Sequence, residues 1–398
     1  MQLIQHPGLR AVAGFRAAGV HCGLKKDRPD LALIVSDRPA VGAVVTTQNA
    51  YAAAPVHVSR QHAADGDVRA IVVNAGIANA CTGRQGLRDA LEMARRTAGE
   101  LGAEPEQVLV ASTGIIGEPL PMEPIRDGIR SAAATLDEAA GDEAALAILT
   151  TDSGPKSTFA TFEHDGRTYR LAGIAKGAGM VHPNLATMLS FLVTDAPVGP
   201  DDLRGCLRAA TDRTFNQISI DGDESTNDMV AVLANGNGPR LSGEGLAAFQ
   251  EALEQACREL AQQIAADGEG ASRLLEVSVR GAKDDEAARR IARAVAGSNL
   301  VKAAIHGADA NWGRILAAAG AADRDLGDDV TLVVGGRHQS VPVLVNGEAQ
   351  DNRRTAAAAL SSSVARIDLD VGDGDGQGEA WGCDLSPDYV RFNAEKTT

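Results

Sequence analysis

The sequence holds 398 residues, and its 38 Lys and Arg against 53 Asp and Glu give a formal net charge of −15. A hydrophobic content of 44% is ordinary for a globular protein and excludes a chain that is mainly disordered. An acidic chain repels nucleic acid phosphates and anionic lipid surfaces, and aromatic residues, at 3%, leave few platforms for base stacking. We therefore expect neither nucleic acid nor a membrane as a partner.

The cysteines and the N-terminus bear on the cellular compartment. The five cysteines lie far apart, and no CxxC pair or His/Cys ligand spacing joins them, which favours reduced thiols over disulfides or a metal site. They are Cys22, Cys81, Cys206, Cys257 and Cys383. The first residues lack the basic start and apolar run of a signal peptide, and no apolar stretch approaches the ~18 to 20 residues that span a bilayer. We predict a cytoplasmic protein without a bound metal.

Predicted strands and helices alternate along the chain. Runs rich in β-branched residues, bounded by Gly, Pro and Asn, predict buried strands at Leu31–Val35, Ala43–Thr47, Ala70–Asn74 and Val108–Ser112. Apolar residues at three- and four-residue spacing predict helices at Leu87–Leu101, Leu246–Ala265 and Asp284–Ala296. Further strands are predicted at Leu275–Val279, Val330–Val334, Val341–Val345 and Val364–Val371. The alternation predicts an α/β fold, and no shift in composition marks a domain boundary.

Two Gly-rich stretches resemble ligand loops but lack the required spacing. Lys176–Gly179 (KGAG) matches neither GxxxxGK[ST] nor GxGxxG, so we do not expect a nucleotide there. In Asp368–Glu379 (DLDVGDGDGQGE), no register supplies the acidic positions and the central glycine of an EF-hand calcium loop. We interpret this run as a hairpin turn in which Gly supplies a positive φ.

The segment from Ala172 to Asp195 carries the clearest chemistry. A loop of small residues with one lysine, Lys176, leads into Ala186 and Thr187 and then into an apolar strand. Small residues let the backbone bend, so the Thr187 hydroxyl can reach the Ala186 carbonyl and start an N-to-O acyl shift. Hydrolysis would free Thr187 as a new N-terminus, whose α-amine, with an ordinary pKa of about 7.7 to 8.0, can act as the base for its own hydroxyl. A merely structural threonine at a strand start is the alternative.

Six further motifs, in one order, extend over essentially the whole chain. They are residues 73–83 (VNAGIANACTG), 112–117 (STGIIG), 149–152 (LTTD), 221–228 (DGDESTND), 307–314 (GADANWGR) and 388–393 (DYVRFN). Together with KGAGM before Ala186-Thr187, they resemble the ornithine acetyltransferase family, the bifunctional glutamate N-acetyltransferases of arginine biosynthesis. Ala75, Ile77 and Glu224 depart from the family's usual residues and leave the fine substrate preference open.

The resemblance implies a self-cleaving transferase. Cleavage between Ala186 and Thr187 would divide the chain into fragments 1–186 and 187–398. Thr187 is then the nucleophile that takes the acetyl group from N-acetylornithine, releases ornithine and passes the acetyl group to glutamate. The implied fold is a layered αββα sandwich built from both fragments, and the implied assembly is an α2β2 heterotetramer.

The resemblance also assigns the other site residues. Thr113 and Gly114 match the oxyanion pair, which donates hydrogen bonds to the negative oxygen of an acyl intermediate. Amino-acid substrates need a cation and an acidic group, and Lys176 and Glu269 match these roles. The implied substrate contacts are Thr151, Lys176, Thr187, Glu269, Asn393 and Thr398. The choice between Thr150 and Thr151 is open, no cofactor is implied, and acetyl-CoA as a second acetyl donor is open.

Two other functions stand as alternatives. An N-terminal-nucleophile aminopeptidase or amidase on the same type of scaffold would pass the acyl group to water, so that added glutamate would capture no acetyl group. A non-enzymatic metal-binding or interaction protein would use the acidic turn at residues 368–375 and would stay uncut.

Overall fold

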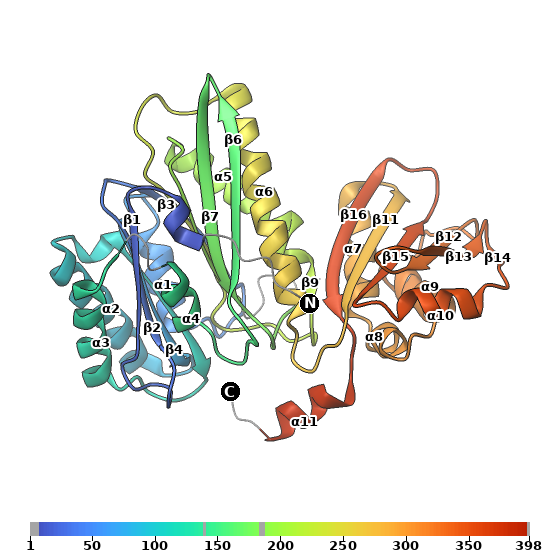
Figure 1. The fold of residues 1–398 in the computed structure, drawn as a ribbon, viewed down its shortest axis with the longest axis horizontal. Helices are drawn as coiled ribbons and strands as arrows, with labels where there is room; N and C mark the ends of the chain where they lie inside the picture. The colour runs from blue at the N-terminus through green and yellow to red at the C-terminus, as the bar shows by residue number, and fades with distance from the viewer. Residues whose placement is uncertain (1–7, 138–140, 183–187, 396–398) are drawn as a thin grey trace.

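The computed structural model describes residues 8–137, 141–182 and 188–395. These form two units, a sandwich coloured blue to yellow and a C-terminal unit coloured orange to red, with α11 (Pro387–Glu395) below their junction (Figure 1). Within these ranges, no helix combines the length and apolar character needed to cross a membrane.

Two sheets stack face to face in the sandwich. The first, in the order β1-β2-β4-β5, contains β1 (Phe15–Val20), β2 (Leu31–Ser36), β4 (Ala70–Ile77) and β5 (Val108–Ile115). The second, in the order β3-β10-β8-β7-β6, contains β3 (Val41–Thr46), β6 (Lys156–His164), β7 (Arg167–Lys176), β8 (Leu189–Thr194) and β10 (Met229–Ala234). Side chains from both inner faces, such as Ile34, Val73 and Phe191, share one buried core. The two sheets therefore form a single folded body.

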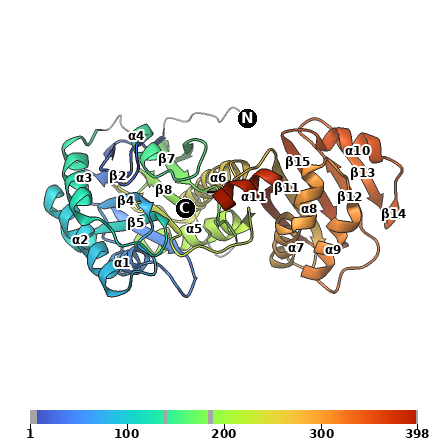
Figure 2. The same ribbon diagram turned by 90° about the horizontal axis from the view of Figure 1, so that it is seen from below.

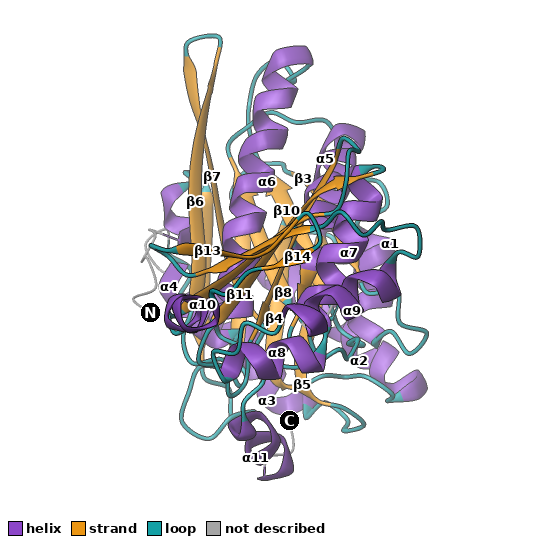
Figure 3. Cartoon of the chain, turned by 90° about the vertical axis from the view of Figure 1, so that its right-hand side faces the viewer, coloured by secondary structure: helices purple, strands orange, loops and turns teal. Residues whose placement is uncertain are grey.

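Helices cover the outer faces of both sheets. Apolar residues of α2 (Gly83–Leu101) and α3 (Met122–Ala134) pack on the first sheet, and those of α5 (Pro200–Arg213) and α6 (Gly243–Ala266) pack on the second. The smaller α1 (Ala54–His62) contacts β5. In contrast, α4 (Gly141–Ala147) contacts β1 and adds Ala144, Ala145 and Ala147 to the core between the sheets. Figure 2 shows the layers from below, and Figure 3 shows the long β6–β7 hairpin rising beside α6. The layers run α, β, β, α, which confirms the predicted sandwich.

The C-terminal unit is a third sheet with helices on one face. Its order is β14-β13-β12-β15-β11-β16-β9. The strands are β9 (Ile218–Ser219), β11 (Leu274–Ala282), β12 (Thr331–Gly335), β13 (Ser340–Val345), β14 (Glu348–Ala349), β15 (Val364–Asp370) and β16 (Gly376–Cys383). The covering helices are α7 (Asp285–Gly297), α8 (Asn299–His306), α9 (Trp312–Ala322) and α10 (Arg353–Leu360). On β11, the predicted alternation holds, because Leu275, Val277 and Val279 enter this core and the residues between them face away.

The predicted hairpin at the Asp/Gly-rich run is wrong. Strand β11 lies between β15 and β16, parallel to the first and antiparallel to the second, so those two strands do not pair. The connection crosses the end of β11, where the Gly374 N–H donates to the Gly281 carbonyl at 3.1 Å. A Cβ on Gly374 would lie 2.0 Å from the Ala282 carbonyl oxygen. The glycines of this run therefore permit a close backbone crossing, which sequence spacing could not reveal.

Candidate active site

A cavity of about 130 Å³, here called the small cavity, lies where the ends of β5 and β7 meet α11. It brings together seven residues from the sequence analysis: Thr113, Gly114, Thr150, Thr151, Lys176, Glu269 and Asn393. Both members of the threonine pair line it. Ala186, Thr187 and Thr398 lie outside the described residues. The predicted residues Thr113 and Asn393, 280 positions apart in the sequence, thus share one small space.

The predicted oxyanion pair, Thr113 and Gly114, lies at a glycine contact between two parallel strands. Gly114, near the end of β5, pairs with Gly76 of β4, and the register shifts directly afterwards. Gly114 has a φ of 128°, and an added Cβ would lie 2.2 Å from the Gly76 carbonyl carbon. Only glycine fits this position, because it accepts the positive φ and the close backbone approach. Thr113, beside it, is 2% exposed.

A buried asparagine fixes the end of β5 in place. The Asn227 Nδ2 group donates to the Ser112 carbonyl at 2.8 Å and to the Ala78 carbonyl at 2.6 Å. The Ser112 hydroxyl in turn donates to Asn74 Oδ1 at 2.6 Å. Asn227 lines the small cavity and belongs to the DGDESTND motif. The motif marks this residue in the sequence, but its hydrogen bond to the end of β5 appears only in the structure. These hydrogen bonds hold the strand end that carries the two predicted oxyanion donors in a fixed direction.

Lys176 supplies a buried positive charge. It ends β7, is 2% exposed, and its Nζ lies 3.7 Å from Asp152 Oδ2. Burial lowers the pKa of Lys176, while Asp152 raises it and Lys156 lowers it further. Burial alone would raise the pKa of Asp152, but Lys176 and Lys156 hold that pKa well below its usual range. Lys176 is thus a buried lysine at the cavity wall, and Asp152 offsets part of the cost of a charge on it.

The small residues of the KGAG stretch make room for Glu269. A Cβ on Gly179 would lie 2.5 Å from the Glu269 carboxyl group. The Glu269 N–H donates to the Ala178 carbonyl at 2.8 Å, which joins the loop after α6 to the loop after β7. From α11, the Asn393 Nδ2 donates to Glu269 Oε2 at 3.0 Å. Two predicted substrate residues are therefore in direct contact.

Acidic residues that the sequence analysis did not assign form another part of the wall. Asp221, Asp223 and Tyr389 all line the small cavity. Asp221 accepts hydrogen bonds from the backbone N–H groups of Met180 at 2.6 Å and Val181 at 2.9 Å. Burial and the nearby carboxylates raise the pKa of the Tyr389 hydroxyl well above its ordinary value. With Glu269, the two aspartates make part of the cavity wall acidic, and Lys176 lines the same cavity.

The first described residue after the proposed cleavage point is anchored to a buried acid. The Met188 N–H donates to Asp228 Oδ1 at 2.9 Å. Asp228 is fully buried, and burial raises the pKa of its carboxyl group well above the ordinary value. The chain that enters β8 therefore starts from a fixed position beside the charge of Lys176.

Comparison with known proteins places the chain in a family. A family model described as the ArgJ family matches residues 16–398. The chain belongs to the ArgJ family. This ArgJ-family chain is 50% identical to the arginine biosynthesis bifunctional protein ArgJ of Synechococcus sp., with 98% of this chain and 97% of the relative covered. It is 47% identical to the protein of that name from Thermosynechococcus vestitus, with 98% of each covered.

A solved structure is also similar in sequence. Ornithine acetyltransferase from Mycobacterium tuberculosis, complexed with ornithine, is 41% identical to this ArgJ-family chain. The match covers 45% of this chain and 96% of that chain, with a TM-score of 0.42.

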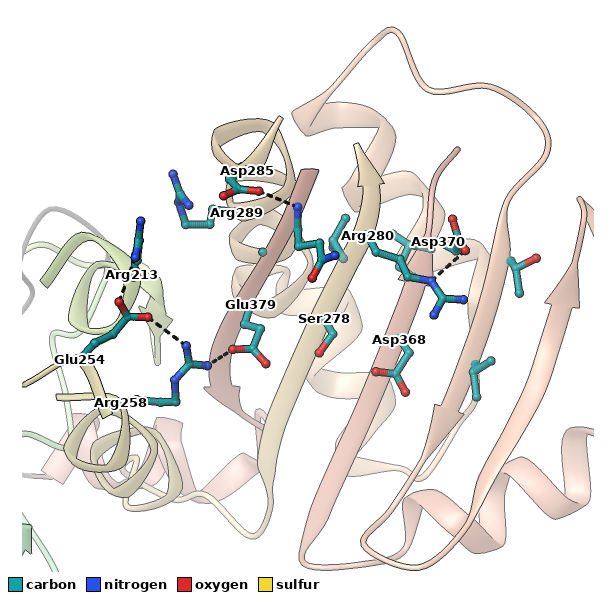
Figure 4. A pocket seen from close by; sticks show the side chains of 16 residues that line it. Arg213, Glu254, Arg258, Ser278, Arg280, Asp285, Arg289, Asp368, Asp370 and Glu379 are labelled. Carbon is teal, nitrogen blue, oxygen red and sulfur yellow. Dashed lines mark hydrogen bonds and ion pairs between the residues drawn. The ribbon is translucent and has the colours of Figure 1, made fainter. Parts of the chain in front are cut away.

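A second, larger cavity of about 720 Å³ lies on the open face of the third sheet of this ArgJ-family chain (Figure 4). We call it the charged groove. Its charged lining residues are Arg213, Glu254, Arg258, Arg280, Asp285, Arg289, Asp368, Asp370 and Glu379. Several neutralise each other: Arg213 pairs with Glu254 at 3.0 Å, and Arg280 pairs with Asp370 at 2.8 Å. None of the residues that the family resemblance assigned lines this groove.

The alternative of a metal-binding protein gains no support from the acidic turn. Across the part of the chain that the structure describes, no group of three or more His, Cys, Asp or Glu side chains is placed to hold a metal ion. Asp373 and Asp375 of that turn lie in the connection that crosses β11. The close backbone crossing at Gly374 gives the turn a structural role.

Proposed function

We propose that this ArgJ-family chain is an acetyltransferase of arginine biosynthesis that moves the acetyl group of N-acetylornithine to glutamate. The observation that carries the proposal is the small cavity, where a rigid oxyanion pair, a buried ammonium group and an acidic wall converge. Family membership over residues 16–398 and the names of relatives at 47 to 50% identity support the same reaction. The amidase alternative has no comparable support.

The reaction proceeds through an acetyl-threonine ester. The Thr187 hydroxyl attacks the acetyl carbonyl of N-acetylornithine and gives its proton to the Thr187 α-amine. Thr113 and Gly114 donate to the resulting oxyanion. The tetrahedral adduct collapses as the C–N bond breaks, and the proton passes to the leaving amine of ornithine. The neutral amine of glutamate then attacks the ester, and Thr187 leaves with a proton while N-acetylglutamate departs.

Opposite charges in the small cavity fit the two substrates. Among the described lining residues, Lys176 is the one cation, and it suits a substrate carboxylate. Asp221, Asp223 and Glu269 suit an ammonium group, which both ornithine and glutamate carry. The low exposure of Lys176 strengthens its attraction for a carboxylate, because little water screens it. Substrate contacts with Thr151, Asn393 and Thr398 are part of the proposal.

Self-cleavage between Ala186 and Thr187 fits the interleaved sheet. Strand β8, from fragment 187–398, pairs with β7 of fragment 1–186, and β10 pairs with β3 in the same way. Strands from 1–186 thus flank both sides of two strands from 187–398. Ladder hydrogen bonds and a shared core would hold the fragments together after cleavage.

Three further parts of the proposal rest on the family resemblance or on general chemistry. The α2β2 assembly is checked by the native mass in light scattering. Use of acetyl-CoA as a second donor is checked by release of free thiol in the presence of glutamate. All five cysteines are free, which fits a reducing compartment such as the cytoplasm.

The test combines processing with product analysis. On a denaturing gel, the purified protein should give two chains, the second beginning Thr-Met-Leu-Ser-Phe, and Thr187→Ala should remain whole at 41.1 kDa. N-Acetylornithine without glutamate should leave an acetyl group on Thr187, detectable by mass spectrometry. With glutamate, N-acetylglutamate should form; release of acetate instead would support the amidase, and an active, uncut Thr187→Ala protein would overturn the proposal.

A further inference from the structure

Four buried or nearly buried charges of alternating sign run away from the small cavity. Lys176 Nζ lies 3.7 Å from Asp152, Asp152 is 2.8 Å from Lys156 Nζ, and Lys156 Nζ is 2.6 Å from Asp267. The side chains of Asp152 and Lys156 are 0% exposed, and that of Asp267 is 12% exposed. Of the four, only Lys176 lines the cavity.

Both oxygens of Asp152 accept hydrogen bonds from the cavity walls. Oδ1 accepts from the Gly177 N–H at 2.6 Å, directly after Lys176, as well as from Lys156 Nζ. Oδ2 accepts from the Thr150 N–H at 3.0 Å. One carboxylate therefore ties the end of β7 to the segment that carries Thr150 and Thr151.

The row of charges reaches a third wall of the cavity through Asp267. Its Oδ2 accepts from the Ser153 N–H at 3.0 Å and from Lys156 Nζ. Asp267 directly follows the last residue of α6 and lies two residues before Glu269, which lines the cavity. Three separate wall segments are thus joined by one set of charge-assisted hydrogen bonds.

The unequal distances around Asp152 have a chemical consequence. Lys156 takes the close contact, and Lys176 keeps only a longer one. A buried cation in close contact with a carboxylate attracts a second anion only weakly. A buried cation whose charge is only partly neutralised by a carboxylate still attracts an anionic ligand. Lys156 therefore leaves Lys176 available to a substrate carboxylate.

We infer that Asp152 is a positioning residue for the transfer reaction, and that Lys156 shares its charge so that Lys176 stays available to bind substrate. The inference rests on the proposed acetyl transfer. It assigns no contact with substrate to Asp152 or Lys156, which act through Lys176 and the Thr150–Thr151 segment.

The charges around Lys176 set opposite expectations for the two residues. Asp152, Glu269 and Asp228 favour its charged form, whereas Lys156 and Lys25 disfavour it. Removing Asp152 should lower the pKa of Lys176, and removing Lys156 should raise it. Since Lys176 must be protonated to hold a carboxylate, the alkaline limb of kcat/KM should follow its pKa.

The experiment measures pH profiles of kcat/KM for N-acetylornithine with the full-length, processed enzyme. Asp152→Asn should move the alkaline limb to lower pH and Lys156→Met should move it to higher pH, each by about one unit or more. If the two residues only supported the fold, the variants would lose activity or stability, but their alkaline limbs would not move in opposite directions. The inference would be overturned if the alkaline limbs of the two variants stayed at the wild-type pH or moved in the same direction.

Two matched controls separate charge effects from lost packing. Asp384→Asn alters another buried carboxylate, which accepts from the N–H groups of Ser272 at 2.7 Å and Arg273 at 2.8 Å. Lys302→Met alters another buried lysine, which donates to the Cys383 carbonyl. Neither faces Lys176, so neither should move the limb.

The outcomes also separate the inference from the proposed function. Wild-type protein that forms no N-acetylglutamate would contradict the proposed function itself. Active wild type with unmoved limbs in the variants contradicts only the inference. If Asp152→Asn does not fold, the direction of the shift in Lys156→Met decides the question, because only charge sharing predicts a shift to higher pH.

Discussion

The small cavity and the charged groove differ in size and in what surrounds their charges. The groove, at about 720 Å³, is several times larger than the small cavity at about 130 Å³. In the groove, the Arg280 side chain is 71% exposed and is paired with Asp370. In the small cavity, the Lys176 side chain is 2% exposed, and its nearest carboxylate is shared with a second lysine.

The difference indicates that buried, partly compensated charge distinguishes the proposed active site better than volume does. Water and salt screen the charges of an open groove, and exposed ion pairs contribute only about 0 to 1 kcal/mol. In a dry cavity, the same charge acts strongly on a bound ligand. Three predictions compare equivalent changes in the two regions.

The largest contrast is expected for removal of one cation from each region. Lys176→Met should lower kcat/KM for N-acetylornithine by about 30- to 4,000-fold, the equivalent of about 2 to 5 kcal/mol for a lost buried charge contact. Arg280→Met should stay within about twofold of wild type, because its charge is exposed and neutralised. Steady-state kinetics at one pH measure both, and a large loss in Arg280→Met would give the groove a part in catalysis.

Removal of one hydroxyl from each region should give the next largest contrast. Thr113→Val keeps the shape of the side chain but removes an oxyanion donor, so kcat should fall by about 10²- to 10³-fold with a smaller change in KM. Thr331, which lines the groove, provides the control, and Thr331→Val should leave kcat unchanged. Full activity in Thr113→Val would leave Gly114 as the only member of the proposed pair.

The smallest contrast concerns the dependence of stability on pH. Burial raises the carboxyl pKa of Asp228 beside the small cavity and of Asp368 in the groove. Above about pH 4, the unfolded chain has lost a proton that the native state still holds, so each group makes stability fall as pH rises toward its native pKa. Asn cannot ionise, so Asp228→Asn should remove part of this fall.

Asp368→Asn should change the slope less, because Asp368 is an exposed residue whereas Asp228 is fully buried. Urea unfolding of each variant at several pH values between 4 and 8 measures the free energy of unfolding and its slope. Equal slopes for both variants would show that the two environments are equally hydrated.

Local patterns predicted most elements but not their partners. The helix expected at Leu246–Ala265 is α6, and the strand expected at Val108–Ser112 is the core of β5. The turn at Asp368–Glu379 was misread, because the residues on either side look like hairpin strands and nothing in the spacing shows that β11 lies between them. The third sheet as a separate unit was also missed, since its composition matches the rest of the chain.

The motifs predicted the chemistry of this protein. Ala186-Thr187 after a Gly-rich loop indicated a self-cleaving nucleophile, and six ordered motifs indicated the family and most site residues. These signals are read from neighbouring residues, where residue type and spacing carry the information.

Only the tertiary structure decided which residues meet and how strongly each charge acts. Asp152 and Asn227 belong to motifs and Lys156 to none, but residue spacing shows the role of none of them. Folding buries all three, Asn227 in the cavity wall and the two charged residues behind it. Their effect on Lys176 and on the end of β5 depends on distance and on exclusion of water, which arise when segments far apart in the chain pack together. The sequence predicts which groups react, and the packing determines how strongly their charges act and how they are oriented.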